Sequence, residues 1–252
     1  MLIRSPIGHA RHGWRALSRA CFATLALAMA SHAHAGVVIQ GTRVVYPANE
    51  REVVVRMTNE RAYPVLVEAW IDRPEGASST QAPVPFALTP PLFRLDAAKG
   101  QTLRIFQSPG AMPTDREVLY YLNVRDIPPK AADAEEEAHV SLAFRSRIKL
   151  FHRPAKLAMP PQDAPRALRW QPAGAGAVRV HNPTPYFVTV TALEPEGGKA
   201  QALTGVMVAP FSDLSIPLDA GNTLQAARKF HYTILNDLGG AVRLPGTVGA
   251  SP

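Results

Sequence analysis

Four cations follow an apolar strand pattern in the middle of the chain, and their spacing suits the binding of an anion on another polypeptide. Val140, Leu142 and Phe144 alternate with small or polar residues, as in a β-strand with one apolar face. The cations that come next, before a proline ends the pattern, are Arg145, Arg147, Lys149 and Arg153. Such a strand can add its edge to a partner's sheet and also bind the partner's negative charge.

Arg43, in the segment GTRVVYP, is a second candidate for anion binding and is considered together with Lys149. Arginine offers a planar fork of donors, lysine a compact charge, and a terminal carboxylate is ionised at neutral pH. Each feature also has a simpler interpretation. Strand cations are mostly solvated, and alternating apolar residues usually mark the buried face of a strand.

Catalytic chemistry finds little support in the sequence. The histidines beyond residue 35 are His139, His152, His181 and His231, which lack metal-ligand spacing such as HExxH. No GxSxG or P-loop pattern is present. The cluster Glu135-Glu136-Glu137 is interpreted as solvated charge beside a sticky strand edge rather than a metal site. We therefore expect a protein that is not an enzyme and needs neither metal nor cofactor.

The first 35 residues have the composition of a signal peptide. Four arginines precede the apolar run Ala20–Ala30, and Ala33-His34-Ala35 supplies the small–x–small pattern that signal peptidase reads. The apolar run is too short to span a bilayer, which takes about 20 residues. We expect an exported, periplasmic protein that starts at Gly36 and does not insert into a membrane.

Removal of this segment changes the charge and the cysteine content. The chain carries a net charge of +7, but four arginines and no acidic residues leave with residues 1–35. The remaining balance is weakly positive, which disfavours nucleic acid as a partner. The only cysteine, Cys21, also leaves, so disulfide and thiolate chemistry are excluded from the mature chain.

The remaining length and pattern predict an all-β protein of two immunoglobulin-like sandwiches. Short alternating runs separated by proline, glycine and asparagine turns are typical of such domains, of about 100 residues each. We expect one domain over residues 36–157 and a second over residues 158–252, because the segment PAKLAMPPQDAP between them has no period. The strands expected in the first domain are Val37–Tyr46, Glu52–Thr58, Val65–Asp72, Phe86–Thr89, Gln101–Gln107, Val118–Asp126 and His139–Phe151.

Several segments resemble those of the periplasmic pilus chaperones of the chaperone–usher pathway. They are DREVLYYLNVRDIPPK and IKLFHRPAKL in the first domain, and VHNPTPYFVTV, VAPFSDLSIPL and YTILNDLGG in the second. The resemblance covers nearly the whole chain after residue 36. It implies two immunoglobulin-like domains set at an angle, with a cleft between them, and a chaperone for pilus subunits that works in the periplasm and delivers to an outer-membrane usher.

The resemblance also implies roles for individual residues. Arg43 and Lys149 match the pair that grips the C-terminal carboxylate of a subunit. Val140, Leu142 and Phe144 match the donor strand that fills the open groove of a subunit. The residues that match an ion network between the domains are Glu117, Arg153 and Asp237. The short loop Ala131–Glu137 is typical of the short-loop branch of the family, and the free protein could cap its own edge as a homo-oligomer.

The sequence alone leaves two questions open. Strict alternation places Lys149 on the strand face opposite to Val140, Leu142 and Phe144, although both features would serve one ligand. Either the strand bulges or twists between Phe144 and Lys149, or the ligand leaves the edge before it reaches the lysine. The alternative function is a secreted immunoglobulin-like adhesion module without a pilus client.

Overall fold

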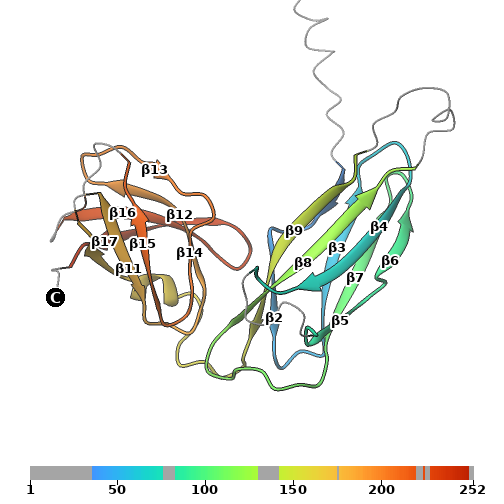
Figure 1. The fold of residues 1–252 in the computed structure, drawn as a ribbon, viewed down its shortest axis with the longest axis horizontal. Coiled ribbons are helices and arrows are strands. Elements are labelled where there is room, and N and C mark those ends of the chain that lie inside the picture. Colours follow the sequence, from blue (N-terminus) through green and yellow to red (C-terminus); the bar gives the residue numbers. More distant parts are fainter. Residues whose placement is uncertain are drawn as a thin grey trace, which may run out of the picture. The chain divides into compact units, whose positions relative to one another are not determined.

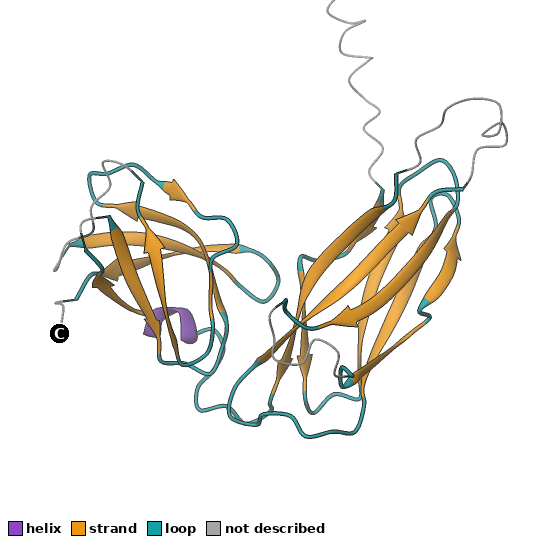
Figure 2. Ribbon diagram, viewed as in Figure 1, coloured by secondary structure: helices purple, strands orange, loops and turns teal. Residues whose placement is uncertain are grey.

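The structure is a computed structural model that describes residues 36–75, 83–129, 142–174, 176–219, 224 and 228–249. Residues 37–252 form one compact unit, in which the described strands build two β-sandwiches (Figure 1). The only helix within the described ranges is the single 3-10 turn η1 (Ala164–Ala167), coloured separately from the strands in Figure 2. None of the described residues belongs to a helix long and apolar enough to cross a membrane.

The first sandwich consists of two sheets. One has the order β1-β3-β7-β5, built from β1 (Val37–Ile39), β3 (Glu52–Asn59), β7 (Gly100–Gln107) and β5 (Phe86–Thr89). The other has the order β2-β9-β8-β4-β6, built from β2 (Arg43–Pro47), β9 (Phe144–Arg153), β8 (Val118–Ile127), β4 (Val65–Asp72) and β6 (Leu92–Leu95). The core lies between the two sheets, where the inward side chains of alternating strands meet.

The expected first strand Val37–Tyr46 is divided between the two sheets. β1 pairs antiparallel with β3, and after a short bend β2 pairs parallel with β9. Gly41 lies in the bend at φ 102°, a backbone conformation that residues with a side chain rarely adopt. The division brings Arg43 beside Lys149, because these two residues are Cα partners in the parallel pair.

Tyr46 shows how the polar groups of the first core are satisfied. Its side chain is fully buried, and its hydroxyl donates to the Glu50 or Arg51 carbonyl and accepts from the Gln107 amide at 3.0 Å. The ring also meets Phe86 edge-on at a centroid distance of 5.4 Å. A buried hydroxyl without such partners would carry a desolvation cost, so this network lets a tyrosine occupy the core.

The second sandwich follows the same plan. One sheet has the order β10-β11-β15, with β10 (Arg169–Pro172), β11 (Ala177–Asn182) and β15 (Ser212–Pro217). The other has β12 (Val188–Pro195) and β16 (Lys229–Leu235) at its centre, flanked by β13 (Gln201–Ala202), β14 (Met207–Val208) and β17 (Ala241–Thr247). Trp170 packs in its core against Phe230 and Tyr232, each at a centroid distance of 5.1 Å.

Three strands, β6, β13 and β17, were not expected from the sequence, and all lie at sheet edges. β6 has only four residues and directly follows Pro90-Pro91, so its alternation is too short to stand out. β17 contains Pro245, which a central strand would not tolerate because proline cannot donate to the ladder. At an edge the missing donor costs nothing, and β17 pairs with β16 over its whole length.

Candidate functional site

Part of β9 has an open edge. Over Phe144–His152 this strand pairs with β8, but on its other side β2 covers only Lys149–Arg153. The edge from Phe144 to Ile148 therefore has no strand partner among the described residues. Unpaired backbone donors and acceptors along such an edge can hydrogen-bond an incoming strand.

The apolar side chains at the start of this edge lie on the surface. Leu142 is 61% exposed and Phe144 55% exposed, so neither belongs to the buried core of the sandwich. The third member of the expected donor row, Val140, lies outside the described residues. The placement of Leu142 and Phe144 favours the donor interpretation over the interpretation of a buried strand face.

The structure answers the question of a bulge. The register of β9 with β8 runs without a shift from Phe144 to His152, so the proposed bulge between Phe144 and Lys149 is wrong. Phe144, Ile148 and Leu150 lie on one face of the strand, and Leu150 is fully buried in the core. Lys149 lies on the opposite, outward face. A ligand of both must either follow the twist of the strand or leave the edge before it reaches the lysine.

Arg43 and Lys149 form a patch of two neighbouring cations. The Arg43 guanidinium lies 5.9 Å from the centroid of the Phe151 ring, and its Nη1 donates weakly to the Leu235 carbonyl at 3.4 Å. Its Nε is buried without a hydrogen-bond partner. The side chain of Lys149 forms neither a hydrogen bond nor an ion pair with any described residue.

The pKa values of both cations reflect this crowding. Burial lowers the pKa of Arg43, although the carboxylates of Asp237 and Glu117 oppose the shift. Burial also lowers the pKa of Lys149, and repulsion by Arg43 adds to the effect. Burial removes water from the charged groups of both cations, and neither has a direct ion pair among the described residues. A bound anion would replace the lost interactions with water, so this patch attracts anions.

The structure brings Glu117, Arg153 and Asp237 into direct contact. Arg153 Nε donates to Glu117 Oε1 at 2.7 Å, and its two terminal nitrogens donate to the Asp237 carboxylate at 2.7 and 2.9 Å. Glu117 precedes β8 in the first sandwich, whereas Asp237 follows β16 in the second. Arg153 at the end of β9 thus joins the two sandwiches through a fork of charge-assisted hydrogen bonds.

Glu117 is the buried member of this network. Its side chain is 2% exposed, and its Oε2 accepts a hydrogen bond from the Phe187 amide of the second sandwich at 2.9 Å. Burial raises the pKa of Glu117, and the charge of Arg153 opposes the shift. Hydrogen bonds to Asp237 and attraction by both carboxylates raise the pKa of Arg153 despite its burial. The negative charge of the buried Glu117 carboxylate is therefore offset by the positive charge of Arg153.

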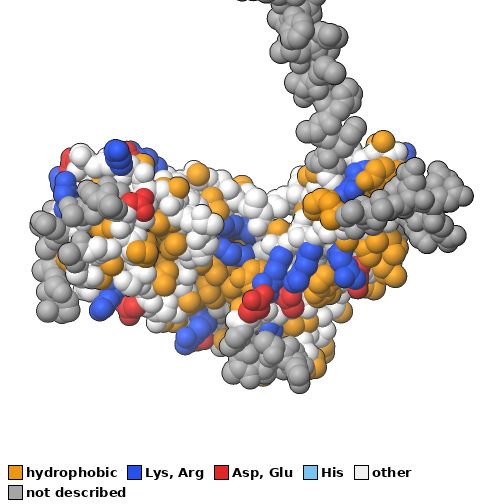
Figure 3. Space-filling view, turned by 45° about the horizontal axis from the view of Figure 1, so that its top comes forward, with side chains coloured by type: hydrophobic (Ala, Val, Ile, Leu, Met, Phe, Trp, Pro, Cys, Tyr) orange, Lys and Arg blue, Asp and Glu red, His pale blue; other side chains and the backbone are white. Residues whose placement is uncertain are grey.

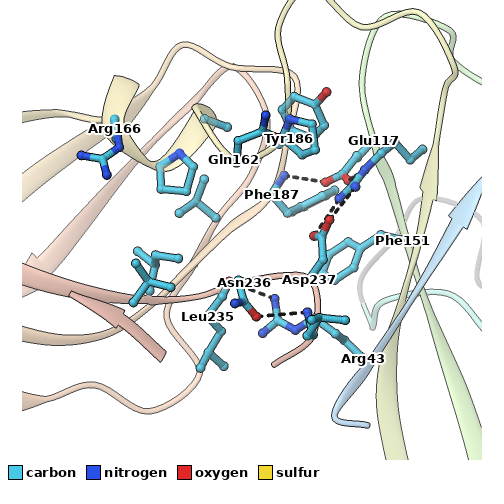
Figure 4. A pocket seen from close by; sticks show the side chains of 18 of the residues that line it. Arg43, Glu117, Phe151, Gln162, Arg166, Tyr186, Phe187, Leu235, Asn236 and Asp237 are labelled. Carbon is cyan, nitrogen blue, oxygen red and sulfur yellow. Dashed lines mark hydrogen bonds and ion pairs between the residues drawn. The ribbon is translucent and has the colours of Figure 1, made fainter. Parts of the chain in front are cut away.

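A pocket of about 450 Å³ lies beside this network (Figure 4). Arg43 and Phe151 line it from the first sandwich, and Phe187, Leu235 and Asn236 line it from the second. Figure 4 shows these side chains arranged around one space, with Arg43 at the turn that carries Asn236 and Asp237. Phe151 and Phe187 are in contact across the two sandwiches, with ring centroids 5.6 Å apart.

Three of the four cations on β9 are already paired, and sequence spacing did not reveal the partner of Arg145 and Arg147. Arg145 and Arg147 share Asp72, at 3.2 and 3.0 Å, and Arg147 lies 3.9 Å above the Tyr121 ring. Figure 3 shows Lys and Arg side chains gathered beside acidic ones on one face of the molecule. These pairs leave Lys149 as the cation of β9 that has no acidic partner among the described residues.

A buried ion pair at the far end of β8 was not indicated by the sequence either. Arg61, between β3 and β4, donates to Asp126 at 3.0 Å, and both side chains are nearly buried. The Arg61 guanidinium lies 5.5 Å from the Phe144 ring, and Phe144 is the strand partner of Asp126. No pattern in the sequence relates Arg61 to Asp126. No group of acidic or histidine side chains in the described part of the chain is suited to hold a metal ion.

Similarity to known proteins identifies the family to which this chain belongs. The N-terminal domain of pili and flagellar-assembly chaperones, PapD type, matches residues 36–158, and the C-terminal domain of the pili assembly chaperone PapD matches residues 163–245. The chain belongs to the family of PapD-like pili assembly chaperones. This membership confirms a fold of two immunoglobulin-like domains and a non-enzymatic protein of the periplasm.

Several relatives match over most of the chaperone. It is 40% identical over 231 residues to the probable fimbrial chaperone YadV of Escherichia coli K12, which covers 88% of this chain and 93% of YadV. It is 42% identical over 236 residues to the chaperone FimB/FhaD of Bordetella pertussis, which covers 91% of this chain and 93% of that one. Among solved structures, the YadV chaperone superposes with a TM-score of 0.73 at 37% identity, over 85% of this chain and 100% of YadV.

A further solved relative contains a client. It is a SafB chaperone in complex with the SafA pilin of Salmonella enterica, with a TM-score of 0.71, 29% identity and coverage of 84% of this chain and 96% of that one. Family membership thus confirms the expectation of a pilus chaperone, and it disfavours the alternative of an adhesion module without a client.

Proposed function

We propose that this periplasmic chaperone stabilises pilus subunits by lending them the edge of β9 as a missing strand. The observation that carries the proposal is the unpaired edge Phe144–Ile148, preceded by the exposed Leu142. Each apolar side chain that enters the groove of a subunit contributes roughly 1.5–3 kcal/mol if it becomes fully buried. Val140, Leu142 and Phe144 together would form the donor row.

The subunit is held in register by its C-terminal carboxylate. Arg43 and Lys149 supply the anchor, because they are half-buried, adjacent and without a direct ion pair to any acidic residue that the structure describes. A carboxylate bound there receives donors from two cations, and such charge-assisted bonds are stronger than neutral ones. Glu117, Arg153 and Asp237 hold the second sandwich against the first, so that Arg43 keeps its place beside Leu235.

Delivery to an outer-membrane usher would use the first domain. Leu66 on β4 and Leu92 on β6 are exposed apolar residues of adjacent strands, and they lie on the same outward face. Neighbouring exposed apolar residues are typical of interaction surfaces. This face is distinct from the open edge of β9, which lies on the far side of β8 from β4, so usher and subunit would bind at the same time.

Two further assignments belong to this proposal. The loop Ala131–Glu137 lies outside the described residues, and its short length supports a place in the short-loop branch of the family. In the absence of a subunit, the open edge of β9 would pair with that of a second copy, giving a self-capped homo-oligomer. An uncovered apolar edge is prone to such pairing.

The donor role is tested by Leu142→Glu. Leu142 is exposed, so the charge meets water in the free protein and should lower the unfolding free energy by less than about 1 kcal/mol. The same charge cannot enter an apolar groove, so the variant should fail to protect co-expressed pilus subunits from proteolysis. Val140→Glu should behave alike.

Val54→Glu is the matched control. Val54 is likewise an exposed apolar residue, but it lies on β3 in the other sheet, away from β9. This variant should fold and protect subunits normally. Full protection of subunits by a folded Leu142→Glu variant would contradict the donor role. Unfolding of the free variant would contradict the exposure of Leu142 at an open edge.

A further inference from the structure

The pocket beside Arg43 has no role in the anchor or in the donor strand. Arg43 lines this pocket, whereas Lys149 does not. A carboxylate bound between the two cations would therefore lie at one rim of the pocket. The volume of about 450 Å³ is within the range of pockets that bind small ligands.

The direction of the client chain determines what faces this pocket. A client whose C-terminus is at Lys149 and whose upstream residues lie along Phe144–Ile148 runs parallel to β9. From Lys149 back to Phe144 its main chain covers about 16 Å, away from Arg43 and the pocket. The side chain of the last residue branches from the carbon that carries the carboxylate, so it is the part of the client nearest to the pocket.

The pocket wall suits an uncharged side chain. Phe151, Phe187, Leu235 and Val242 supply apolar surface. Both carboxylates in the wall, Glu117 and Asp237, are already paired with Arg153. A cationic side chain would meet Arg43 and Arg153 without a free acidic partner, and a glycine or alanine would leave the apolar wall uncovered.

We propose that this pocket is a specificity site for the last residue of the client, and that it selects an uncharged side chain of at least leucine size. The inference rests on the proposed carboxylate anchor at Arg43 and Lys149. It adds a preference that the anchor alone does not create, because every polypeptide ends in a carboxylate. Subunits would then be distinguished from other exported chains by their final side chain as well as by their open groove.

The test measures binding of short strand-forming peptides to the mature chaperone. The probes are fluorescein-Val-Thr-Val-Thr-Val-Thr-X with X as leucine, glycine or lysine, each as the free acid and as the C-terminal amide. Fluorescence anisotropy gives the dissociation constants. The leucine acid should bind about tenfold more tightly than the glycine acid, since burial of most of its side chain is worth that factor. The lysine acid should bind no better than glycine.

Two chaperone variants locate the effect. Val242→Trp fills the pocket, so the preference for leucine over glycine should disappear while the preference for acid over amide remains. Arg243→Trp is the matched control on the same strand, with its side chain on the opposite face and more than half exposed, and it should keep both preferences. If Val242→Trp fails to fold, Leu238→Trp replaces it with the same expected result, because Leu238 lines the pocket and is 89% exposed.

The outcomes separate the pocket from the anchor. Equal binding of the leucine and glycine acids, with weaker binding of both amides, would contradict the pocket inference but agree with the carboxylate anchor. A leucine preference that survives in folded Val242→Trp would also overturn the pocket. Equal binding of acids and amides, or no binding of any peptide, would overturn the anchor and the pocket inference with it.

Discussion

Arg43 and Lys149 are Cα partners in the parallel pair of β2 and β9, so two like charges share one half-buried patch. Burial and mutual repulsion lower the pKa of Lys149, which means that its charged form costs free energy in the unbound protein. The patch is a feature of binding rather than of folding. Its residues should therefore separate stability from function when they are replaced.

Lys149→Met is expected to leave the free chaperone as stable as the wild type or slightly more stable. The apolar stem is retained and the repulsion of Arg43 is removed. Subunit binding should weaken about tenfold or more, because a charge-assisted bond to the carboxylate is lost. Thermal unfolding and pulldown of co-expressed subunits measure the two effects. Normal subunit recovery by both Lys149→Met and Arg43→Ala would exclude the anchor.

Arg153→Ala should destabilise the protein more than Asp237→Asn. The first change leaves the buried Glu117 carboxylate without its cation, and breaking a buried pair in this way typically costs about 3–5 kcal/mol. Asp237 is about half exposed, so its loss should cost about 1 kcal/mol or less. Denaturant unfolding gives the two values, and small-angle scattering of Arg153→Ala should show a broader distribution of shapes. If both variants lose the same small amount of unfolding free energy and the scattering is unchanged, Arg153 is only a surface charge.

Gly239→Ala should disturb the contact between the sandwiches. Gly239 lies in the turn after β16 at φ 81°, and a Cβ there would collide with the side chain of Thr42 ahead of β2. Gly197, in the second sandwich, has φ 73° but open space around it, so Gly197→Ala measures the backbone strain alone. That strain is worth about 1–2 kcal/mol.

Only Gly239→Ala should also weaken subunit binding, because its turn carries Asp237 and lies next to Leu235, the partner of Arg43. Unfolding midpoints and subunit pulldown of the two variants provide the comparison. Identical behaviour of Gly239→Ala and Gly197→Ala would mean that the approach of Gly239 to Thr42 has no part in positioning the anchor.

The stability of the first sandwich should fall in mild acid because of His152. This side chain is 2% exposed, and burial lowers its pKa below the ordinary value of 6.5. Its Nδ1 has no hydrogen-bond partner in the described structure. Below about pH 6.5 the unfolded chain binds a proton that the folded chain resists, so the unfolding free energy decreases as the pH falls toward the folded pKa.

Denaturant unfolding at pH 7.5, 6.5 and 5.5 measures this loss. His152→Gln should lose part of the pH dependence, whereas His231→Gln, a histidine of the second sandwich, should retain the loss in the first sandwich. An unfolding free energy of the wild type that is constant over this range would contradict the assignment.

Local patterns in the sequence were sufficient for the strands whose side chains alternate clearly. β3 and β4 each present a long alternating run, because burial of one sheet face selects apolar residues at every second position. The cations of β9 and the apolar residues before them were visible for the same reason. Their resemblance to known segments supplied the pairing of Arg43 with Lys149 and of Arg153 with Asp237, which no spacing could indicate.

Tertiary structure alone decided which strand edges stay open and which charges stay unpaired. Gly41 moves the chain from one sheet to the other, and only this crossing places β2 against the last half of β9 and leaves Phe144–Ile148 without a second strand partner among the described residues. Asp72 pairs with Arg145 and Arg147 but does not bind Lys149. These outcomes depend on contacts between residues far apart in the chain. Such contacts depend on the packing of whole sheets, whereas a sequence pattern records only the preferences of near neighbours.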